Sequence, residues 1–236
     1  MEKLERALTQ LGVEYTPKMI QQFREYMEGI LEWNEKINLT AITDPDEFVV
    51  KHYIDSVLAA GQREVKDARR VIDVGTGAGF PGIPLAILFP EKAFVLMDSL
   101  NKRLKVIDDL CGRIGILNVT TVHSRAEELA RNPKHRACYD LCVSRAVANM
   151  ATLAEYCLPF LCKGGYFLAY KGPDYQEELA RAKGAVRILG GEFLEAREAE
   201  IADFELSHKI LYIRKVKDTP AKYPRKAGIP SKEPLK

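Results

Sequence analysis

Residues 71–87, VIDVGTGAGFPGIPLAI, place three glycines at alternate positions between two apolar runs. The first run, 71–74, has the composition of a buried strand, and the second is consistent with a helix. Glycine adopts positive φ readily and lets another molecule approach the backbone closely. In α/β sheets, ligands bind in the crevice at the carboxyl ends of the strands. The motif therefore predicts a ligand against Gly75, Gly77 and Gly79, although a tight turn without a ligand is the alternative.

The chain after residue 67 alternates between strand-like and helix-like stretches, which is typical of a parallel sheet covered on both faces. Two successive strands without an intervening helix, 192–200 and 209–215, should pair antiparallel and finish the sheet at one edge. We therefore predict an α/β fold with a Rossmann-like, mostly parallel sheet. The predicted strands before this pair are 71–74, 93–97, 119–122, 141–143 and 166–170, and the predicted helices are 82–89, 102–114, 126–130, 150–161 and 175–189.

The first sixty residues have a helical pattern instead. Leu4, Leu8 and Leu11 are spaced for one helix face, the dipeptide Thr16-Pro17 is a helix-start signal, and a further helix is expected over 46–59. These patterns divide the chain into an N-terminal helical extension (1–66), a ligand-binding domain (67–217) and a C-terminal tail (218–236).

Charge is distributed unevenly along the 236 residues. Nine Lys or Arg residues and two acids give residues 209–236 a formal charge of +7, against +2 for the whole chain, so residues 1–208 carry −5. The end of the chain also holds four prolines and little apolar content, and we expect it to be an extended basic tail.

Composition excludes several classes of protein. No apolar run approaches the roughly 18 residues that a membrane span needs, and the first residues lack the pattern of a secretory signal. The five cysteines form no C-x-x-C pair, and no second ligand pair has metal-site spacing. We expect a reduced, cytoplasmic protein without a metal.

The glycine spacing favours a ligand without phosphate. The dinucleotide fingerprint is G-x-G-x-x-G, whereas this loop reads G-x-G-x-G, and Pro81 and Pro84 remove amide donors from the following helical turn. S-adenosylmethionine fits these conditions. A dehydrogenase with a nicotinamide cofactor is the less favoured alternative.

Two further positions suit the adenosine part of such a ligand. Asp98 ends the second predicted strand, where a carboxylate can accept hydrogen bonds from ribose hydroxyls; alternatively it caps the next helix, a role that Ser99 could fill instead. Ala126 and Glu127 follow the third strand, where the adenine edge should lie, although a surface acid at a helix start explains Glu127 equally well.

At these residues the sequence resembles the bacterial ribosomal RNA small-subunit methyltransferase G family, also called GidB. The stretches that carry the resemblance are WNEKINLTAI (33–42), HYIDS (52–56), DVGTGAGFPGIPLAI (73–87), DSLNKR (98–103), RAEEL (125–129), SRAV (144–147) and YPRKAGIPSKEPL (223–235). The resemblance implies a class I methyltransferase that moves a methyl group from S-adenosylmethionine to N7 of a guanine in 16S rRNA. It also implies cofactor contacts by Gly75, Phe80, Ala126, Glu127 and Arg145.

Chemistry at guanine N7 requires no general base, because this nitrogen carries a lone pair and no proton. Arg145, at the end of the fourth strand, cannot act as a base, but it can orient the cofactor carboxylate or contact guanine O6. A structural ion pair is the alternative for Arg145. His52 and Asp55 share a helix face, and we favour a structural clamp over acid–base work for them.

The expected partner is small-subunit rRNA or a 30S particle, bound by a monomer. Lys171, Lys222, Arg225 and Lys226 are the predicted RNA contacts, since cations suit a phosphate backbone. A non-catalytic RNA-binding module that responds to S-adenosylmethionine is the remaining alternative function.

Overall fold

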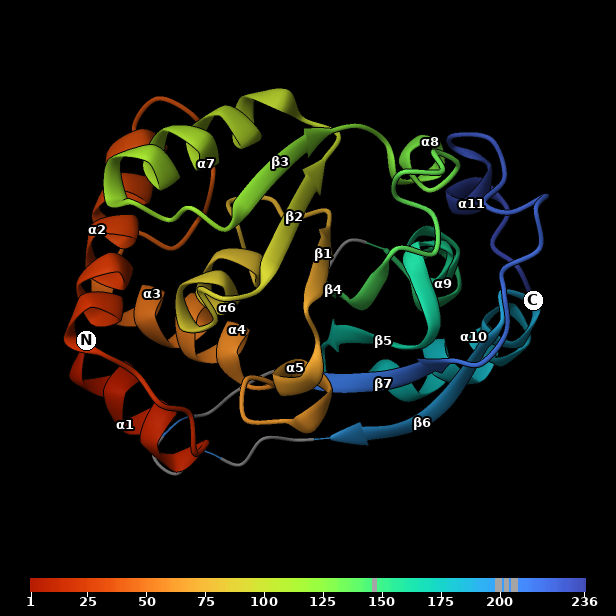
Figure 1. The fold of residues 1–236 in the computed structure, drawn as a ribbon, viewed down its shortest axis with the longest axis horizontal. Coiled ribbons are helices and arrows are strands. Elements are labelled where there is room, and N and C mark those ends of the chain that lie inside the picture. The colour runs from red at the N-terminus through yellow and green to blue at the C-terminus, as the bar shows by residue number, and fades with distance from the viewer. Residues whose placement is uncertain (146–147, 198–200, 202–203, 205–207) are drawn as a thin grey trace.

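The computed structural model describes the chain except for residues 146–147, 198–200, 202–203 and 205–207 (Figure 1). Its centre is a seven-stranded sheet in the order β3-β2-β1-β4-β5-β7-β6. β1 to β5 pair in parallel, and β7 pairs antiparallel with both β5 and β6. The strands are β1 Arg70–Val74, β2 Ala93–Asp98, β3 Val119–His123, β4 Tyr139–Arg145, β5 Leu161–Lys171, β6 Gly191–Arg197 and β7 Lys209–Lys215.

This topology confirms the predicted Rossmann-like sheet with its antiparallel pair at one edge. Each predicted strand is present, and the parallel strands β1 to β5 extend beyond the predicted apolar runs, by five residues at the start of β5. The strand predicted over 192–200 corresponds to β6, and the last three of its residues lie outside the described part of the chain.

Alternating side chains of the central strands enter two hydrophobic clusters, one on each face of the sheet. On β4, Leu141 and Val143 join the cluster that contains the N-terminal helices, whereas Cys142 joins the cluster of α9 and α10. Both faces are therefore covered, as parallel sheets require. The sequence-predicted helices are α6 Gly82–Leu88, α7 Asn101–Ile114, α8 Ala126–Leu129, α9 Met150–Cys157 with the short 3₁₀ helix η2 Leu158–Phe160, and α10 Tyr175–Ile188.

The N-terminal residues pack into the first of these clusters together with the sheet. Thr16 caps α2 as predicted, because its hydroxyl accepts the Met19 N–H at 3.2 Å. Tyr26 of α2 donates its hydroxyl to the carbonyl of Ala78 at 2.9 Å, directly in the glycine loop. The elements of this part are α1 Glu2–Gln10, α2 Pro17–Asn34, α3 Pro45–Phe48, η1 Val49–Ile54, α4 Asp55–Val57 and α5 Arg63–Asp67.

The single helix expected over 46–59 is interrupted. Its middle, η1, is a π-helix, with α3 before it and α4 after it. Single π turns inside helices are rare and are frequently found at functional sites. This one places His52 against Arg145 at the end of the central strand β4.

The end of the chain differs from the expected extended tail. Residues 216–236, called the C-terminal segment below, fold back over α8 and α9 and include the short helix α11 Ile229–Lys232 (Figure 1). Tyr223 and Pro230 are buried. The prediction was wrong because low apolar content does not reveal that buried acids elsewhere in the chain bind this segment's cations and backbone amides.

Candidate functional site

A cavity of ≈ 460 Å³ opens at the carboxyl ends of β1, β2 and β4. This is the position at which α/β sheets bind ligands. Seven of the eight predicted cofactor contacts line it, and Gly79 does not. Its wall consists of Leu39, His52, Val74, Gly75, Thr76, Gly77, Ala78, Phe80, Met97, Asp98, Ser99, Leu100, Arg103, Ser124, Arg125, Ala126, Glu127, Arg145 and Tyr156.

The glycine loop depends on positive backbone angles and on a buried acid. Gly75, Gly77 and Gly79 have φ of 75°, 62° and 92°, values that side chains other than glycine adopt only with strain. Asp73 Oδ2 accepts the Thr76 hydroxyl at 2.7 Å and the Gly82 N–H at 2.9 Å. Burial raises the pKa of Asp73 to about 7. Asp73 therefore ties the end of β1 to the start of α6 across the loop.

Gly79 serves the packing of the loop. A Cβ built at this position would lie 2.5 Å from the Tyr26 hydroxyl and 2.6 Å from Ile83 Cγ1. At Gly77, by contrast, a Cβ would meet no protein atom within 4 Å. The sequence pattern groups the glycines, but the structure assigns Gly77 to the cavity and Gly79 to the contact with α2.

Most backbone N–H groups of the loop, with the exception of that of Ala78, are already engaged within the protein. Gly75 and Thr76 donate to the carbonyl of Met97, and Gly79 and Phe80 donate to that of Thr76. Gly77 donates to Asp98 Oδ2 at 2.9 Å. A pyrophosphate site is built from free N–H donors, so this loop suits a ligand without phosphate.

Asp98 is buried at the end of β2 and faces the cavity. Its Oδ1 accepts the Leu100 N–H at 2.8 Å, and Oδ2 accepts the Gly77 N–H. Each carboxylate oxygen has a second lone pair with which it can accept a further donor. The alternative role as a helix cap is not observed for Asp98 or Ser99, because the N-cap residue of α7 is Leu100 and no side chain caps this helix.

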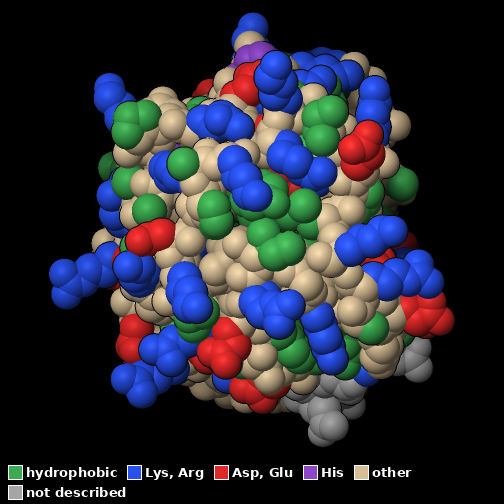
Figure 2. All heavy atoms as spheres, turned by 90° about the vertical axis from the view of Figure 1, so that its right-hand side faces the viewer, with side chains coloured by type: hydrophobic (Ala, Val, Ile, Leu, Met, Phe, Trp, Pro, Cys, Tyr) green, Lys and Arg blue, Asp and Glu red, His purple; other side chains and the backbone are tan. Residues whose placement is uncertain are grey.

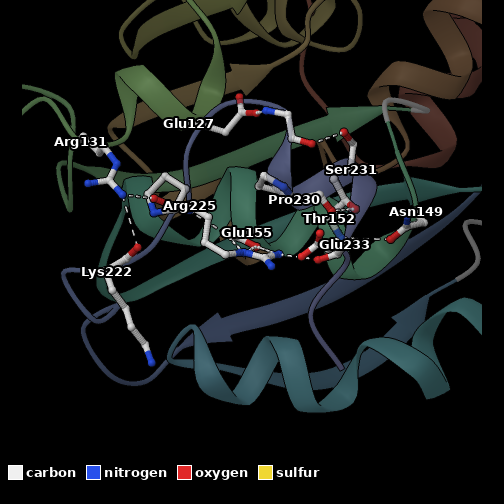
Figure 3. A network of polar contacts seen from close by, with 12 residues as sticks. Glu127, Arg131, Asn149, Thr152, Glu155, Lys222, Arg225, Pro230, Ser231 and Glu233 are labelled. Carbon is white, nitrogen blue, oxygen red and sulfur yellow. Dashed lines mark hydrogen bonds and ion pairs between the residues drawn. The ribbon is translucent and has the colours of Figure 1, made fainter.

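Glu127 is buried in the opposite wall and contacts the C-terminal segment. Its Oε1 accepts the N–H of Gly228 at 2.9 Å (Figure 3). Ala126 beside it is also buried, with an exposed fraction of 7%. The reading of Glu127 as a surface acid at a helix start is therefore wrong, since only 5% of this residue is exposed.

Arg145 joins the sheet to the N-terminal helices at the rim of the cavity. Its Nη1 donates to Asp55 Oδ2 at 2.8 Å, and its guanidinium lies over the Phe80 ring at 5.3 Å from the centroid. The other oxygen of Asp55, Oδ1, lies 2.8 Å from His208 Nδ1. Arg145 thus makes the structural ion pair considered above and lines the cavity as well.

His52 lies against the same guanidinium, with its ring stacked on Phe80 at 4.6 Å and 2° between the planes. Arg145 Nη2 approaches His52 Nδ1 at 3.3 Å, and Nε2 lies 2.7 Å from the Thr40 hydroxyl. Burial, with the positive charge of Arg145, lowers the pKa of His52 to about 4. Because both ring nitrogens are engaged and the ring is neutral, the geometry favours the structural clamp over acid–base work.

Two of the four predicted RNA contacts are corrected by the structure. Lys171 is buried and donates to Glu178 at 2.6 Å and to the Ala148 carbonyl at 2.9 Å. Arg225 forms an ion pair at 2.7 Å with Glu155, whose side chain is fully buried. Counting cations along a sequence cannot show which of them are already paired with a buried acid.

Lys222 and Lys226 are exposed on the C-terminal segment. Figure 2 shows the side of the molecule formed by α8, α10, α11 and this segment. Lys and Arg side chains are spread over most of that face and surround a small apolar patch. Such a surface is complementary to a polyanion.

The sequence analysis did not predict several residues that line the cavity. Tyr156 comes from α9, Arg125 from the turn before α8, and Leu39 from the loop after α2. Arg125 stands directly before the predicted pair 126–127, and this adjacency was its only available signal. Among the described residues no group of three or more His, Cys, Asp or Glu side chains is arranged to hold a metal ion, and the five cysteines are free.

Comparison with known proteins gives a consistent assignment. Residues 19–205 match the family model GidB, described as rRNA small subunit methyltransferase G. Ribosomal RNA small subunit methyltransferase G of Clostridium novyi is 49% identical over 229 residues, which are 97% of this chain and 94% of the relative. The Alkaliphilus metalliredigens protein of the same name is 46% identical, covering 96% of this chain and 95% of the relative.

Solved structures share the fold at low sequence identity. A putative O-methyltransferase from Klebsiella pneumoniae has a TM-score of 0.54 at 13% identity, covering 87% of this chain and 92% of that one. A SAM-dependent O-methyltransferase from Thermotoga maritima has a TM-score of 0.53 at 16% identity, covering 80% of this chain and 71% of that one. These likenesses support a class I methyltransferase fold.

Proposed function

Because the chain belongs to the rRNA small subunit methyltransferase G family, we propose that it transfers the methyl group of S-adenosylmethionine to N7 of a guanine in 16S rRNA. The enzyme is an S-adenosylmethionine-dependent methyltransferase of small-subunit rRNA. The cavity at the carboxyl ends of β1, β2 and β4 is the proposed cofactor site.

The cavity fits this cofactor on two observations. The open space beside Gly77 lets a ligand lie against the backbone. Most N–H groups of the loop are engaged within the protein, which disfavours a dinucleotide pyrophosphate and therefore the dehydrogenase alternative. In the proposed pose, Asp98 accepts the ribose hydroxyls and Glu127 faces the adenine edge.

The observation that carries the choice of N7 is the state of the titratable side chains in the wall. Asp98 and Glu127 each accept backbone N–H groups, and His52 is neutral with both nitrogens engaged. None of these three is poised to remove a proton. Alkylation of a nitrogen that carries no proton needs no such group.

The protein then has to orient the reactants and accommodate the positive charge that moves from the sulfur to the guanine ring. When bound, the cofactor supplies a methyl group that is already activated on sulfur. Nη1 of Arg145 is engaged by Asp55 and Nη2 lies against His52. We assign the remaining N–H donors of the guanidinium to the cofactor carboxylate or guanine O6. Its position over Phe80, fixed by Asp55 and His52, makes this donor rigid.

The proposed RNA surface is the basic face around Lys222 and Lys226, which are exposed on the C-terminal segment. Sequence-specific recognition of RNA commonly uses an unpaired base that can be splayed out. We propose a guanine in a loop of 16S rRNA, or of an assembling 30S particle, as the substrate. The enzyme is proposed to act as a monomer.

Incubation of the protein with labelled S-adenosylmethionine and either 16S rRNA or 30S particles tests this function. We expect label in one guanine, located by chain scission specific for 7-methylguanine. Arg145→Gln should lose most of this incorporation while it still folds. Cofactor binding without incorporation into either substrate would instead support a non-catalytic RNA-binding module.

A further inference from the structure

The C-terminal segment contacts two buried acids with its inner side, and both acids lie close to the cofactor cavity (Figure 3). Glu127 belongs to the cavity wall itself. Glu155 lies on α9, next to Tyr156, which is also part of the wall. Both backbone N–H groups and a side chain of the segment donate to these acids. The contacts therefore fix the position of the segment's backbone as well as that of the Arg225 side chain.

Arg225 is the stronger of the two attachments. Its backbone N–H donates to Glu155 Oε1 at 2.7 Å, Nε lies 3.0 and 3.2 Å from the two carboxylate oxygens, and Nη2 lies 2.7 Å from Oε2. The same Nη2 reaches the Glu233 carbonyl at 2.8 Å. Arg225 therefore fixes the segment on both sides of the turn at Gly228.

The turn at Gly228 carries the contact with the cavity. Gly228 has φ of 82° and ψ of −16°, a left-handed conformation that aims its N–H at Glu127 Oε1. Its carbonyl accepts the Ser231 hydroxyl at 3.1 Å, and the Pro230 carbonyl accepts the Thr152 hydroxyl of α9 at 2.9 Å. The turn is thus stabilised by a hydrogen bond within the segment and by another from α9.

We propose that residues 225–232 support the wall of the cofactor site from behind, where the Gly228 N–H orients the Glu127 carboxylate toward the amino group of adenine. One oxygen of Glu127 is taken by Gly228, and the other accepts the N–H of the nucleobase. Gly228 and Arg225 are positioning residues, because they act on the ligand through Glu127. This inference rests on the proposed function and adds to it the residues that set selectivity for an adenosyl ligand.

Pre-organisation explains why such an attachment matters for affinity. A carboxylate that is free to rotate loses side-chain freedom when it binds a ligand, whereas one already held by a backbone donor loses less. The hydrogen bond to a charged acceptor is also stronger than one between neutral groups. Release of the Gly228 N–H should therefore weaken binding of a ligand that carries the adenine amino group.

A matched pair of glycine substitutions isolates this effect. At Gly228 and at Gly115 a Cβ would meet no protein atom within 4 Å, and φ is +82° and +74°. Alanine at either position therefore strains a left-handed turn without a steric clash. Gly115 ends α7 and is not part of the cavity wall, so Gly115→Ala controls for the loss of stability.

Isothermal titration calorimetry with S-adenosylhomocysteine provides the readout. Alanine keeps the backbone N–H, but relaxation of its strained left-handed φ turns that N–H away from Glu127. We therefore expect Gly228→Ala to raise Kd about tenfold, the equivalent of one such hydrogen bond. Gly115→Ala should leave Kd within about twofold of the wild type. Arg225→Lys, which keeps the charge and loses the forked geometry, should raise Kd in the same direction as Gly228→Ala.

A second ligand separates orientation of Glu127 from general damage. S-inosylhomocysteine has a carbonyl where adenine has its amino group. Gly228→Ala should therefore reduce the wild-type preference for the adenosyl ligand, as Glu127→Gln should. Equal weakening of both ligands, or an unchanged Kd in Gly228→Ala, would overturn the inference alone. Failure of the wild-type protein to bind either ligand would overturn the proposed function with it.

Discussion

The ion pair between Arg225 and Glu155 offers a direct test of how the C-terminal segment is held. Glu155 is fully buried, and its partner's side chain retains 24% of its exposure. In Arg225→Gln the carboxylate keeps the backbone N–H of residue 225 and loses the three contacts from the guanidinium. The substitution leaves a buried charge that the new side chain does not neutralise.

The expected cost follows from that geometry. Removal of one partner of a buried ion pair typically costs about 3–5 kcal/mol of unfolding free energy. The retained backbone hydrogen bond places this case at the lower end, about 3 kcal/mol. For a chain of this size each kcal/mol lowers Tm by about 2–4 °C, so we expect a fall of about 6–12 °C.

Urea unfolding followed by circular dichroism measures the loss, with Arg63→Gln as control. Arg63 forms an ion pair with Asp67 at 2.9 Å, and their side chains are 90% and 66% exposed. Such an exposed pair contributes about 0.3–0.5 kcal/mol. The double substitution Arg225→Gln with Glu155→Gln should recover part of the loss, since it removes the buried charge. A cost in Arg225→Gln no larger than in Arg63→Gln would refute the reasoning.

Three further outcomes are expected. Gly79→Ala should lower the free energy of unfolding by more than about 3 kcal/mol. Gly77→Ala should lower it by about 1–2 kcal/mol and should mainly reduce the affinity for S-adenosylhomocysteine. Equal unfolding midpoints of the two variants would contradict this division of roles. The native pKa of His52, about 4 against 6.5 for the unfolded chain, means that stability is lost as pH falls from about 6.5 to 4, by on the order of 3 kcal/mol. His52→Gln should flatten the pH dependence of the unfolding free energy in that window, and an unchanged profile would count against the buried neutral ring. Substitution of Lys222 or Lys226 by alanine should reduce the slope of log K against log salt for RNA binding by about 0.7 each, and an unaltered slope would remove that residue from the RNA surface.

Local patterns were sufficient to predict most of the fold. Side chains of a central parallel strand are covered on both faces of the sheet, so such a strand is a continuous apolar run in the sequence. The run 93–97 was predictable as a strand for this reason. The pair 192–200 and 209–215 was recognised because no helix separates the two runs. The glycine loop was located at the end of β1 for a similar reason, since its own residues carry the local signal.

Local sequence patterns could not predict features that depend on contacts between residues far apart in the chain. The close approach of Tyr26 to Gly79 links positions 26 and 79, and neither residue signals the other. The pairing of Arg225 with Glu155 likewise joins elements far apart in the chain. The π turn of η1 has no recognised sequence signal, so an uninterrupted helix was the natural expectation.

The position of β7 also constrains how the protein forms during synthesis. β7 lies between β5 and β6, although β6 precedes it in the chain. A growing chain that has just exposed β6 therefore presents an unpaired edge on β5 and a strand without a neighbour, a combination prone to association with other chains. Only translation past residue 215 allows both edges to close together, so a chain stalled before that point should be bound by chaperones or aggregate.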